Sequence, residues 1–442
     1  MRILVIGAGQ VGATIVAALH SDHDLTVIDL DPGRLSALSH HYDVTTVEGD
    51  GASRRSLQQA GVKDVNLLIA CTSRDEVNII SSMLTKKLSP ETKTIVRTTK
   101  VEYLEVWQER QLDADFLVSS ELETAYAIST LIGVPAARQT DVFAGGQVQI
   151  VEFDVEDTSG TPDVIGVPLR RAQIPADSKV ASIIRGGAMR IPRGGESIQA
   201  GDRIIIIGSP EAARQWSEIM ARGVGRVEDV VIFGCGRIGT AVARVLLDQG
   251  IGVRMVEAVA ARAREVAEEF PEARVYQATG VEPDFLERER IGAAKAAIFA
   301  MRDDAKNLYA ATLARLHGVR FGIAVVHESI SERVFEKSGV AIPINPRSIT
   351  AEEIVRFARD PRTQQVAMLE GDRYEVLDIT VRGESKLANR PFRELPMTGS
   401  LIGAVIRDGQ ALFPHGDDML MPGDRAILFT ESRRVGEVER AL

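Results

Sequence analysis

Cysteine is scarce in this sequence, which contains only two, Cys71 and Cys235, among 442 residues. Two cysteines so far apart form neither a CxxC motif nor the disulfide framework of a small secreted domain. The sequence therefore fits a reducing compartment. Each thiol is expected to be a small, packed apolar residue rather than a redox group.

Long hydrophobic runs are also missing. A membrane-spanning helix needs about 18 consecutive apolar residues, whereas the longest runs here are short, such as 204–207 and 230–233. Residues 1–12 are apolar but lead directly into a glycine loop, without the cleavage site of a signal peptide. We therefore expect no membrane span and a cytoplasmic location.

The sequence also lacks an excess of basic charge and any known catalytic motif. Lys and Arg total 52 against 62 Asp and Glu, a net charge of −10, whereas nucleic-acid-binding proteins usually carry a basic excess. The seven histidines have no metal-binding spacing, and only His327, at an expected strand end, is a candidate ligand contact. There is no phosphate loop of the form G-x-x-x-x-G-K-[ST]. A nucleic-acid partner, a metal site and a nucleophilic enzyme are therefore not expected.

The sequence does contain a long internal repeat. The segment RILVIGAGQVG at 2–12 recurs as DVVIFGCGRIG at 229–239, and Asp29 has its counterpart in Glu257, 228 positions later. Each copy is a buried strand followed by G-x-G-x-x-G. Such a repeat indicates a duplicated domain.

A smaller unit is repeated in the same order. Arg185 and Asp202 recur 222 positions later as Arg407 and Asp424. The chain is therefore expected to contain a large unit, a small unit, a second large unit and a second small unit, in that order. These four units exceed the three domains that roughly 150 residues per domain would give. The four expected units span residues 1–135, 140–223, 226–360 and 366–442.

The pattern of each large unit predicts an α/β fold. The run Ile3–Ile6 is apolar without alternation, which is typical of a strand buried on both faces of a parallel sheet. Strands alternate with helical segments, so each large unit is expected to be a Rossmann-like, doubly wound parallel sheet. Each small unit is expected to be an α+β module, with a short helix near 167–172 and 390–395.

The glycine loops point to a phosphate ligand. Gly7 permits a tight turn, Gly9 leaves room for a pyrophosphate, and Gly12 lets the helix pack close to the sheet. The unpaired N–H groups at the start of that helix then face the phosphates. The second loop repeats the arrangement with Gly234, Gly236 and Gly239. The alternative is a turn that has lost its ligand.

Asp29 sets the expected nucleotide class. It lies 17 residues after Gly12, at the expected end of the second strand, where a carboxylate accepts both ribose hydroxyls of an adenosine. It would repel a 2′-phosphate, so NADP is disfavoured, but it does not separate NAD from ATP or ADP. The alternatives are a surface residue or a helix cap.

Three more residues are expected at the rim of the first site, and the second site differs at each. Asp50, Thr72 and Arg97 follow successive strands, and Arg97 either pairs with a phosphate or makes an ordinary surface ion pair. Arg237 replaces Gln10 in the second glycine loop. The repeat alignment also places Thr279, Met301 and His327 opposite Asp50, Thr72 and Arg97. The two sites are therefore non-equivalent, or the second has degenerated.

The chain resembles the TrkA family of regulatory subunits of bacterial potassium uptake. The matching motifs are GAGQVG with Asp29, the pair Gly49–Asp50, Arg97, GCGRIG with Glu257, and INPRSITAEEIVRFAR at 344–359. The resemblance implies two RCK nucleotide-binding domains, each followed by a TrkA-C domain. By motif match it implies first-site contacts from Gly7, Gly9, Gln10, Val11, Gly12, Asp29, Asp50, Thr72 and Arg97, and second-site contacts from Gly234, Gly236, Arg237, Ile238, Gly239 and Glu257.

The same resemblance implies a function without catalysis. Members bind NAD or NADH and ATP or ADP, and four subunits form a ring at the inner face of the membrane beneath a potassium channel subunit of the Trk type. Nucleotide-dependent changes of the ring would then gate the pore. The alternatives left open are an NAD-dependent dehydrogenase, a nucleotide-sensing regulator of a different transporter, and a scaffold that binds no nucleotide.

Overall fold

The computed structural model describes residues 1–21, 23–135, 137–156, 164–220, 227–358, 363–369, 373–395 and 399–442. Gly223 and Gly225, which the sequence places between the two halves, lie outside these ranges. In the described part of the chain no helix combines the length and apolar character needed to cross a bilayer.

The first large unit is a parallel sheet of six strands in the order β3-β2-β1-β4-β5-β6. The strands are β1 (Arg2–Ile6), β2 (Asp24–Asp29), β3 (Thr45–Glu48), β4 (Leu67–Ala70), β5 (Lys93–Thr98) and β6 (Phe116–Ser119). The helices are α1 (Gln10–Leu19), α2 (Pro32–His41), α3 (Arg54–Gln59), α4 (Asp75–Leu88), α5 (Glu102–Gln108) and α6 (Ser120–Gly133). The order reverses at β1, as in a Rossmann-like fold.

The second large unit repeats this topology as β14-β13-β12-β15-β16-β17. The strands are β12 (Asp229–Phe233), β13 (Gly252–Glu257), β14 (Arg274–Gln277), β15 (Ala296–Phe299), β16 (Gly322–Val325) and β17 (Ile342–Ile344). The helices are α8 (Arg237–Asp248), α9 (Ala260–Glu269), α10 (Pro283–Arg288), α11 (Asp304–Leu316), α12 (Ser329–Ser338) and α13 (Pro346–Ala358). The predicted tandem duplication of an α/β domain is confirmed.

The apolar run of β1 is buried on both faces, as predicted. Ile3 and Val5 belong to one core cluster, whereas Leu4 and Ile6 belong to another on the opposite face. Successive side chains of a strand point to opposite faces, so an uninterrupted apolar run is what a sheet covered by helices on both sides requires.

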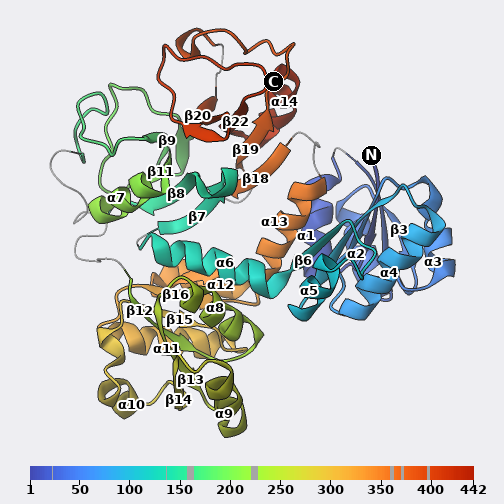
Figure 1. The fold of residues 1–442 in the computed structure, drawn as a ribbon, viewed down its shortest axis with the longest axis horizontal. Coiled ribbons are helices and arrows are strands. Elements are labelled where there is room, and N and C mark those ends of the chain that lie inside the picture. The colour runs from blue at the N-terminus through green and yellow to red at the C-terminus, as the bar shows by residue number, and fades with distance from the viewer. Residues whose placement is uncertain are drawn as a thin grey trace.

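The last helix of each large unit covers the sheet of the other unit. Figure 1 shows α13 beside α1 and α6 beside α8. Ile354 of α13 is fully buried in the core of the first sheet, next to Ile15 and Val16 of α1. Ile128 of α6 is equally buried, in the core that contains Val242 of α8. The two large units therefore exchange helices, and neither core is complete without the other.

The small units are two antiparallel sheets of five strands, β10-β9-β11-β8-β7 and β18-β19-β22-β20-β21. The first contains β7 (Ala137–Phe143), β8 (Val148–Asp154), β9 (Ser178–Arg185), β10 (Ala188–Arg190), β11 (Arg203–Gly208) and α7 (Pro210–Met220). The second contains β18 (Thr363–Leu369), β19 (Tyr374–Thr380), β20 (Ser400–Arg407), β21 (Gln410–Leu412), β22 (Arg425–Glu431) and α14 (Val435–Ala441).

The short helix expected near 167–172 is wrong. This segment consists of turns held by an isolated bridge between Pro168 and Ser197, and its counterpart contains only the 3₁₀ turn Phe392–Glu394. The N–H groups of Leu169 and Arg170 donate to the carbonyls of Glu196 and Gly194, at 2.8 and 2.9 Å, so these backbone groups are not available for a helix.

The two small sheets pack face to face within the chain. Along β11, Ile204 and Ile206 lie on the face of the sheet that packs against α7. Ile205 and Ile207 lie on the opposite face, which packs against the second sheet, and share a core with Phe429 of β22. The Gln147 side chain adds a polar link, because its Nε2 donates to the Gly409 carbonyl at 2.8 Å. The small units thus form a second contact between the halves.

A repeated ion pair explains the sequence match between the small units. The Arg185 guanidinium binds both carboxylate oxygens of Asp202, at 2.6 and 2.7 Å. Arg407 does the same to Asp424, at 2.9 and 2.8 Å. Both carboxylates are buried, and a bidentate pair fixes the geometry of each turn before the final strand.

Candidate functional site

The first glycine loop has the geometry that the motif predicts. Gly7 has φ +108°, and a Cβ there would lie 3.1 Å from the Thr72 backbone nitrogen. A Cβ on Gly12 would overlap the carbonyl oxygen of Gly7. Both positions therefore require glycine, the first for its backbone conformation and the second for the close approach of α1 to β1.

The start of α1 is open to a ligand. Gly9 is the N-cap residue and supplies no side-chain hydrogen bond to the helix, whereas α2 is capped by Asp31, which accepts from the Gly33 N–H at 2.8 Å. Around Gly9 the nearest atom to a built Cβ is Arg34 Nη1, at 3.9 Å. Free N–H groups with space beside them fit an anion such as a pyrophosphate.

Asp29 both faces this crevice and holds its loop in place. Its Oδ2 accepts from the Ala8 N–H at 2.6 Å and its Oδ1 from the Asp31 N–H at 2.8 Å. The cap of α2 is thus Asp31, not Asp29. A carboxylate has about four acceptor positions, so two remain for ribose hydroxyls.

Thr72 and Arg97 are brought together by a buried amide. The fully buried Asn78 donates to the Thr72 carbonyl at 3.0 Å and to the Arg97 carbonyl at 2.9 Å. Arg97 Nη1 in turn donates to the Thr72 carbonyl at 3.3 Å, and Nε to Ser120 Oγ at 2.8 Å. Burial lowers the pKa of Arg97 from its usual value. The guanidinium is half-buried and bound to neutral acceptors.

Asp50 lies at the same edge of the sheet. The preceding Gly49 donates its N–H to the Asp29 carbonyl at 2.9 Å, and Asp50 Oδ1 accepts from the Ala52 N–H at 2.9 Å. The carboxylate is exposed. The glycine loop and the side chains predicted from the first repeat therefore meet at the carboxyl ends of the strands, where such sheets bind ligands.

The second loop reproduces these contacts. Gly234 has φ +97°, and a Cβ on Gly239 would overlap the Gly234 carbonyl oxygen. Glu257 accepts from the Cys235 N–H at 3.1 Å and from the Val259 N–H at 2.9 Å. Gly236 caps α8 without a side-chain hydrogen bond. The backbone of the second crevice is thus formed as fully as that of the first.

The side chains of the second rim differ, and one sequence assignment is wrong. The buried Asn307 holds the carbonyls of Met301 and Val325, at 3.0 and 2.9 Å, as Asn78 holds those of Thr72 and Arg97. The counterpart of Arg97 is therefore Val325, not His327. One fewer residue separates these positions in the second copy, so Arg97 and Val325 are 228 positions apart, and pairing Arg97 with His327, 230 positions away, goes two residues too far.

His327 occupies the place of Thr99 in the first copy. Its backbone N–H and its ring Nδ1 both bind the Asp304 carboxylate, at 3.1 and 2.9 Å. Thr99 binds the corresponding Asp75, at 3.0 Å through both N–H and hydroxyl. Each of these contacts anchors the end of a strand to the start of the helix that precedes that strand.

One pair of residues near the loops was missed by the sequence analysis. Arg34 lies over Gly9, as described above, and Arg262 Nε donates to the Cys235 carbonyl in the second loop at 3.0 Å. These arginines are 228 positions apart, the same offset as Asp29 and Glu257. The repeat therefore held a signal for a cation beside each loop.

The cysteines are packed thiols, as expected. Cys71 and Cys235 are both buried, and burial raises the pKa of each thiol to about 12. A thiol with so high a pKa forms little of the reactive thiolate. Among the described residues no group of three or more His, Cys, Asp or Glu side chains is placed to hold a metal ion.

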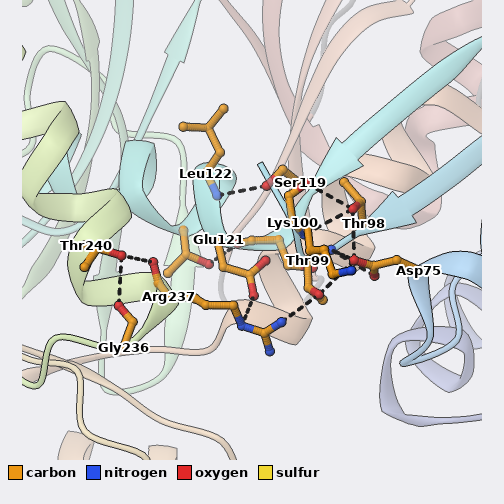
Figure 2. A network of polar contacts seen from close by, with 12 residues as sticks. Asp75, Thr98, Thr99, Lys100, Ser119, Glu121, Leu122, Gly236, Arg237 and Thr240 are labelled. Atoms are coloured by element: carbon orange, nitrogen blue, oxygen red, sulfur yellow. Dashed lines mark hydrogen bonds and ion pairs between the residues drawn. The ribbon is translucent and has the colours of Figure 1, made fainter. Parts of the chain in front are cut away.

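Each glycine loop also touches the opposite half of the chain. Gln10 of the first loop contacts Arg347 of α13. Arg237 of the second loop donates to Thr99 Oγ1 at 2.8 Å and forms an ion pair with Glu121 of α6 at 3.5 Å (Figure 2). Arg347 and Glu121 are the second residues of the exchanged helices. The two contacts are therefore equivalent in position, and the helix residues that make them, Arg347 and Glu121, carry opposite charges.

Comparisons with known proteins agree with this architecture. The TrkA-N domain model matches residues 3–120 and 230–346, and the TrkA-C domain model matches 151–221 and 376–442. A Trk system potassium uptake protein TrkA homolog of Archaeoglobus fulgidus is 31% identical over 99% of both chains. The Trk system potassium uptake protein TrkA of Halomonas elongata is 30% identical, over 100% of this chain and 98% of that one.

A solved structure shares the fold. The GsuK channel bound to NAD aligns with a TM-score of 0.60 and 17% identity, over 100% of this chain and 78% of that chain. The relationship rests on two domain models that together match most of the sequence, in alternating order, and on full-length relatives that are 31% and 30% identical. The chain belongs to the TrkA family of potassium uptake proteins.

Proposed function

We propose that the protein is a non-enzymatic regulatory subunit that binds NAD or NADH and ATP or ADP in its two glycine-loop crevices. The observation that carries this proposal is the pair of uncapped helix starts, each with a carboxylate at the end of the next strand. In the first crevice these are Gly9 and Asp29, and in the second Gly236 and Glu257. NAD in the related GsuK fold supports the ligand class.

The conformational change caused by nucleotide binding would be transmitted to a membrane potassium channel subunit of the Trk type, at the inner face of the membrane. The names of the full-length relatives support this partner. A ligand shifts a conformational equilibrium only by its difference in affinity for the two states. A tenfold difference per site corresponds to about 1.4 kcal/mol, and several coupled sites add.

A ring of four subunits would supply those coupled sites. Apolar side chains are exposed on the outer helices of both large units, namely Ile80 on α4, Tyr309 on α11 and Ile330 on α12. Ile80 and Tyr309 are repeat counterparts, 229 positions apart. Exposed apolar side chains at matching positions of both halves are suited to contacts between copies of the same chain.

The first test is calorimetric titration of the purified protein with NAD, NADH, ATP and ADP. Asp29→Ala is expected to weaken binding to the first crevice at least tenfold, because the ribose loses its acceptor. Glu257→Ala should do the same in the second crevice. Asp24→Ala is the matched control, because Asp24 is an exposed acidic residue at the opposite end of the same strand.

Thermal melting must accompany each titration, because Asp29 also holds the loop. Unchanged affinity for all four nucleotides in both variants would contradict the assignment of the crevices. Steady NADH absorbance with candidate substrates is expected, and turnover would instead favour a dehydrogenase. Potassium flux through a Trk-type channel in liposomes, with and without nucleotide, tests the regulatory step.

A further inference from the structure

A buried carboxylate lies between the two candidate sites. Glu121, in the first turn of α6, is only 6% exposed. Its Oε1 lies 3.5 Å from Arg237 Nε, whereas its Oε2 has no hydrogen-bond partner among the residues that the structure describes. Figure 2 shows the carboxylate facing the Arg237 side chain, which reaches over from the second glycine loop.

The cations around Glu121 come from both sites. Arg237 is part of the second loop, and Arg97 is part of the first rim; both lower the pKa of Glu121. Arg97 itself binds only the neutral acceptors Ser120 and Thr72, and Arg347 of α13 acts on it as a like charge. Glu121 is therefore an anion shared by one arginine of each site.

The remaining charges nearby are already engaged. Asp75 of α4 raises the pKa of Glu121, but its own carboxylate accepts from Thr98 and Thr99. Lys100, after β5, pairs with Glu76 at 3.4 Å. Besides its own backbone N–H, which also lowers the pKa of Glu121, the carboxylate is compensated by Arg237 and, to a smaller degree, by Arg97.

Burial makes the protonation of this carboxylate sensitive to the charges around it. An ionised carboxylate in a buried position is costly unless it is paired and hydrogen-bonded, and burial raises the pKa of Glu121 to about 7. Losing either cation would raise that pKa further. The protonation of Glu121 therefore changes near neutral pH when its arginines change partners.

We propose that Glu121 is an internal counter-ion of both nucleotide sites, which competes with ligand phosphate for Arg237 and Arg97 and takes up a proton when phosphate displaces it. The proposal rests on the proposed function, because it needs nucleotide phosphate at the glycine loops. The proton comes from solvent and no bond other than O–H forms.

Two consequences follow for binding. Proton uptake on binding means that affinity rises as pH falls. A rise of one unit in the pKa of Glu121, from about 7, makes binding about fivefold tighter at pH 6 than at pH 8. A nucleotide that neutralises Glu121 also removes the competitor at the other site, so the two sites are positively coupled, and the coupling is reciprocal.

The test is calorimetric titration with NADH at pH 6, 7 and 8, in buffers of two different ionisation enthalpies. NADH is the probe because its pyrophosphate stays fully ionised over this range, whereas a terminal phosphate such as that of ATP titrates near pH 6. A chelator in every buffer keeps divalent cations from neutralising the carboxylate. Glu121→Gln is compared with wild type, and Glu105→Gln, on the exposed side of α5, is the control.

Wild type and Glu105→Gln are expected to take up a fraction of a proton per NADH at pH 7 and to bind more tightly at pH 6. Glu121→Gln should take up none and should bind as tightly at pH 8 as at pH 6. An unchanged pH dependence in Glu121→Gln, or an equal loss of affinity at every pH, would overturn the proposal.

One further variant and the wild-type titration keep the outcomes distinct. Arg237→Ala removes one cation from Glu121, so proton uptake at pH 7 should shrink; the Arg237 side chain is 63% exposed, so this variant is expected to fold even where Glu121→Gln does not. Unchanged uptake would count against the shared counter-ion. If wild type binds no NADH at any pH, the proposed function itself fails.

Discussion

At the scale of single residues, one acidic side chain in each half both holds the glycine loop and lies where a ligand would bind. Asp29 and Glu257 each accept one backbone N–H of their glycine loop and one of the turn that follows their own strand. Each lies at the strand end beside the crevice. A substitution there changes loop geometry as well as ligand contacts. Losing the acceptor of a buried N–H costs about 1–3 kcal/mol, so binding and stability must be measured together.

Glu121 leads to a prediction about stability. Its pKa is raised from 4.5 in the unfolded chain to about 7 in the folded protein. A raised pKa means that the folded state holds its proton longer, so the contribution of Glu121 to stability is lost as pH rises from about 4.5 to 7. We expect Glu121→Gln to be more stable than wild type at pH 8, by about 1–3 kcal/mol.

The measurement is denaturant unfolding of both proteins at pH 5 and pH 8. The difference should be much smaller at pH 5, where Glu121 is protonated in the folded state. A destabilised variant at pH 8 would show instead that the ion pair with Arg237 outweighs the cost of burial.

At the scale of elements, the exchanged helices α6 and α13 join the two large units. Each places a buried apolar face on the sheet of the opposite half, through Ile128 and Ile354. Each also begins beside the glycine loop of that half, through Glu121 and Arg347. A change in one crevice therefore has a rigid element through which to reach the other half.

The exchange predicts a crossed pattern of destabilisation. Ile354→Ala, in α13, should increase hydrogen exchange in β1 and β4 of the first unit, and Ile128→Ala, in α6, should do so in β12 and β15 of the second. Truncating a buried isoleucine costs about 2–5 kcal/mol. Loosening confined to the unit that contains each substitution would contradict the observed packing.

At the scale of the whole molecule, one chain contains two large units and two small units, each pair packed together. If four chains of 48.0 kDa assemble, light scattering should give a mass of about 192 kDa, that is 4 × 48.0. Tyr309→Asp and Ile330→Asp place charges on the exposed apolar residues of α11 and α12 and should reduce that mass.

Ser39→Asp, on the exposed side of α2, is the control and should leave the assembly intact. A single chain per particle in the wild type would contradict the ring. An unchanged tetramer in both aspartate variants would mean that another surface holds it together.

The repeat made much of this architecture predictable. The G-x-G-x-x-G loops, the apolar run of β1 and the acidic ends of β2 and β13 are local patterns, and the structure has them as predicted. Other features depended on register or pairing. His327 was paired with Arg97 at an offset of 230 positions, whereas the structure gives 228, because the second copy has one residue fewer between the buried asparagine and the strand end. Segment 167–172 forms turns, and its Pro168 is bridged to Ser197.

The sequence by itself determined the order of the units, the parallel α/β sheets of the large units, and the backbone of both crevices, because these follow from side-chain periodicity and from the conformations that only glycine allows. Only the tertiary structure decided which sheet each terminal helix covers and which charges meet between the crevices. An apolar helix face does not specify its partner, and the energy of a carboxylate such as Glu121 depends on burial and on distances to arginines that are remote in the chain.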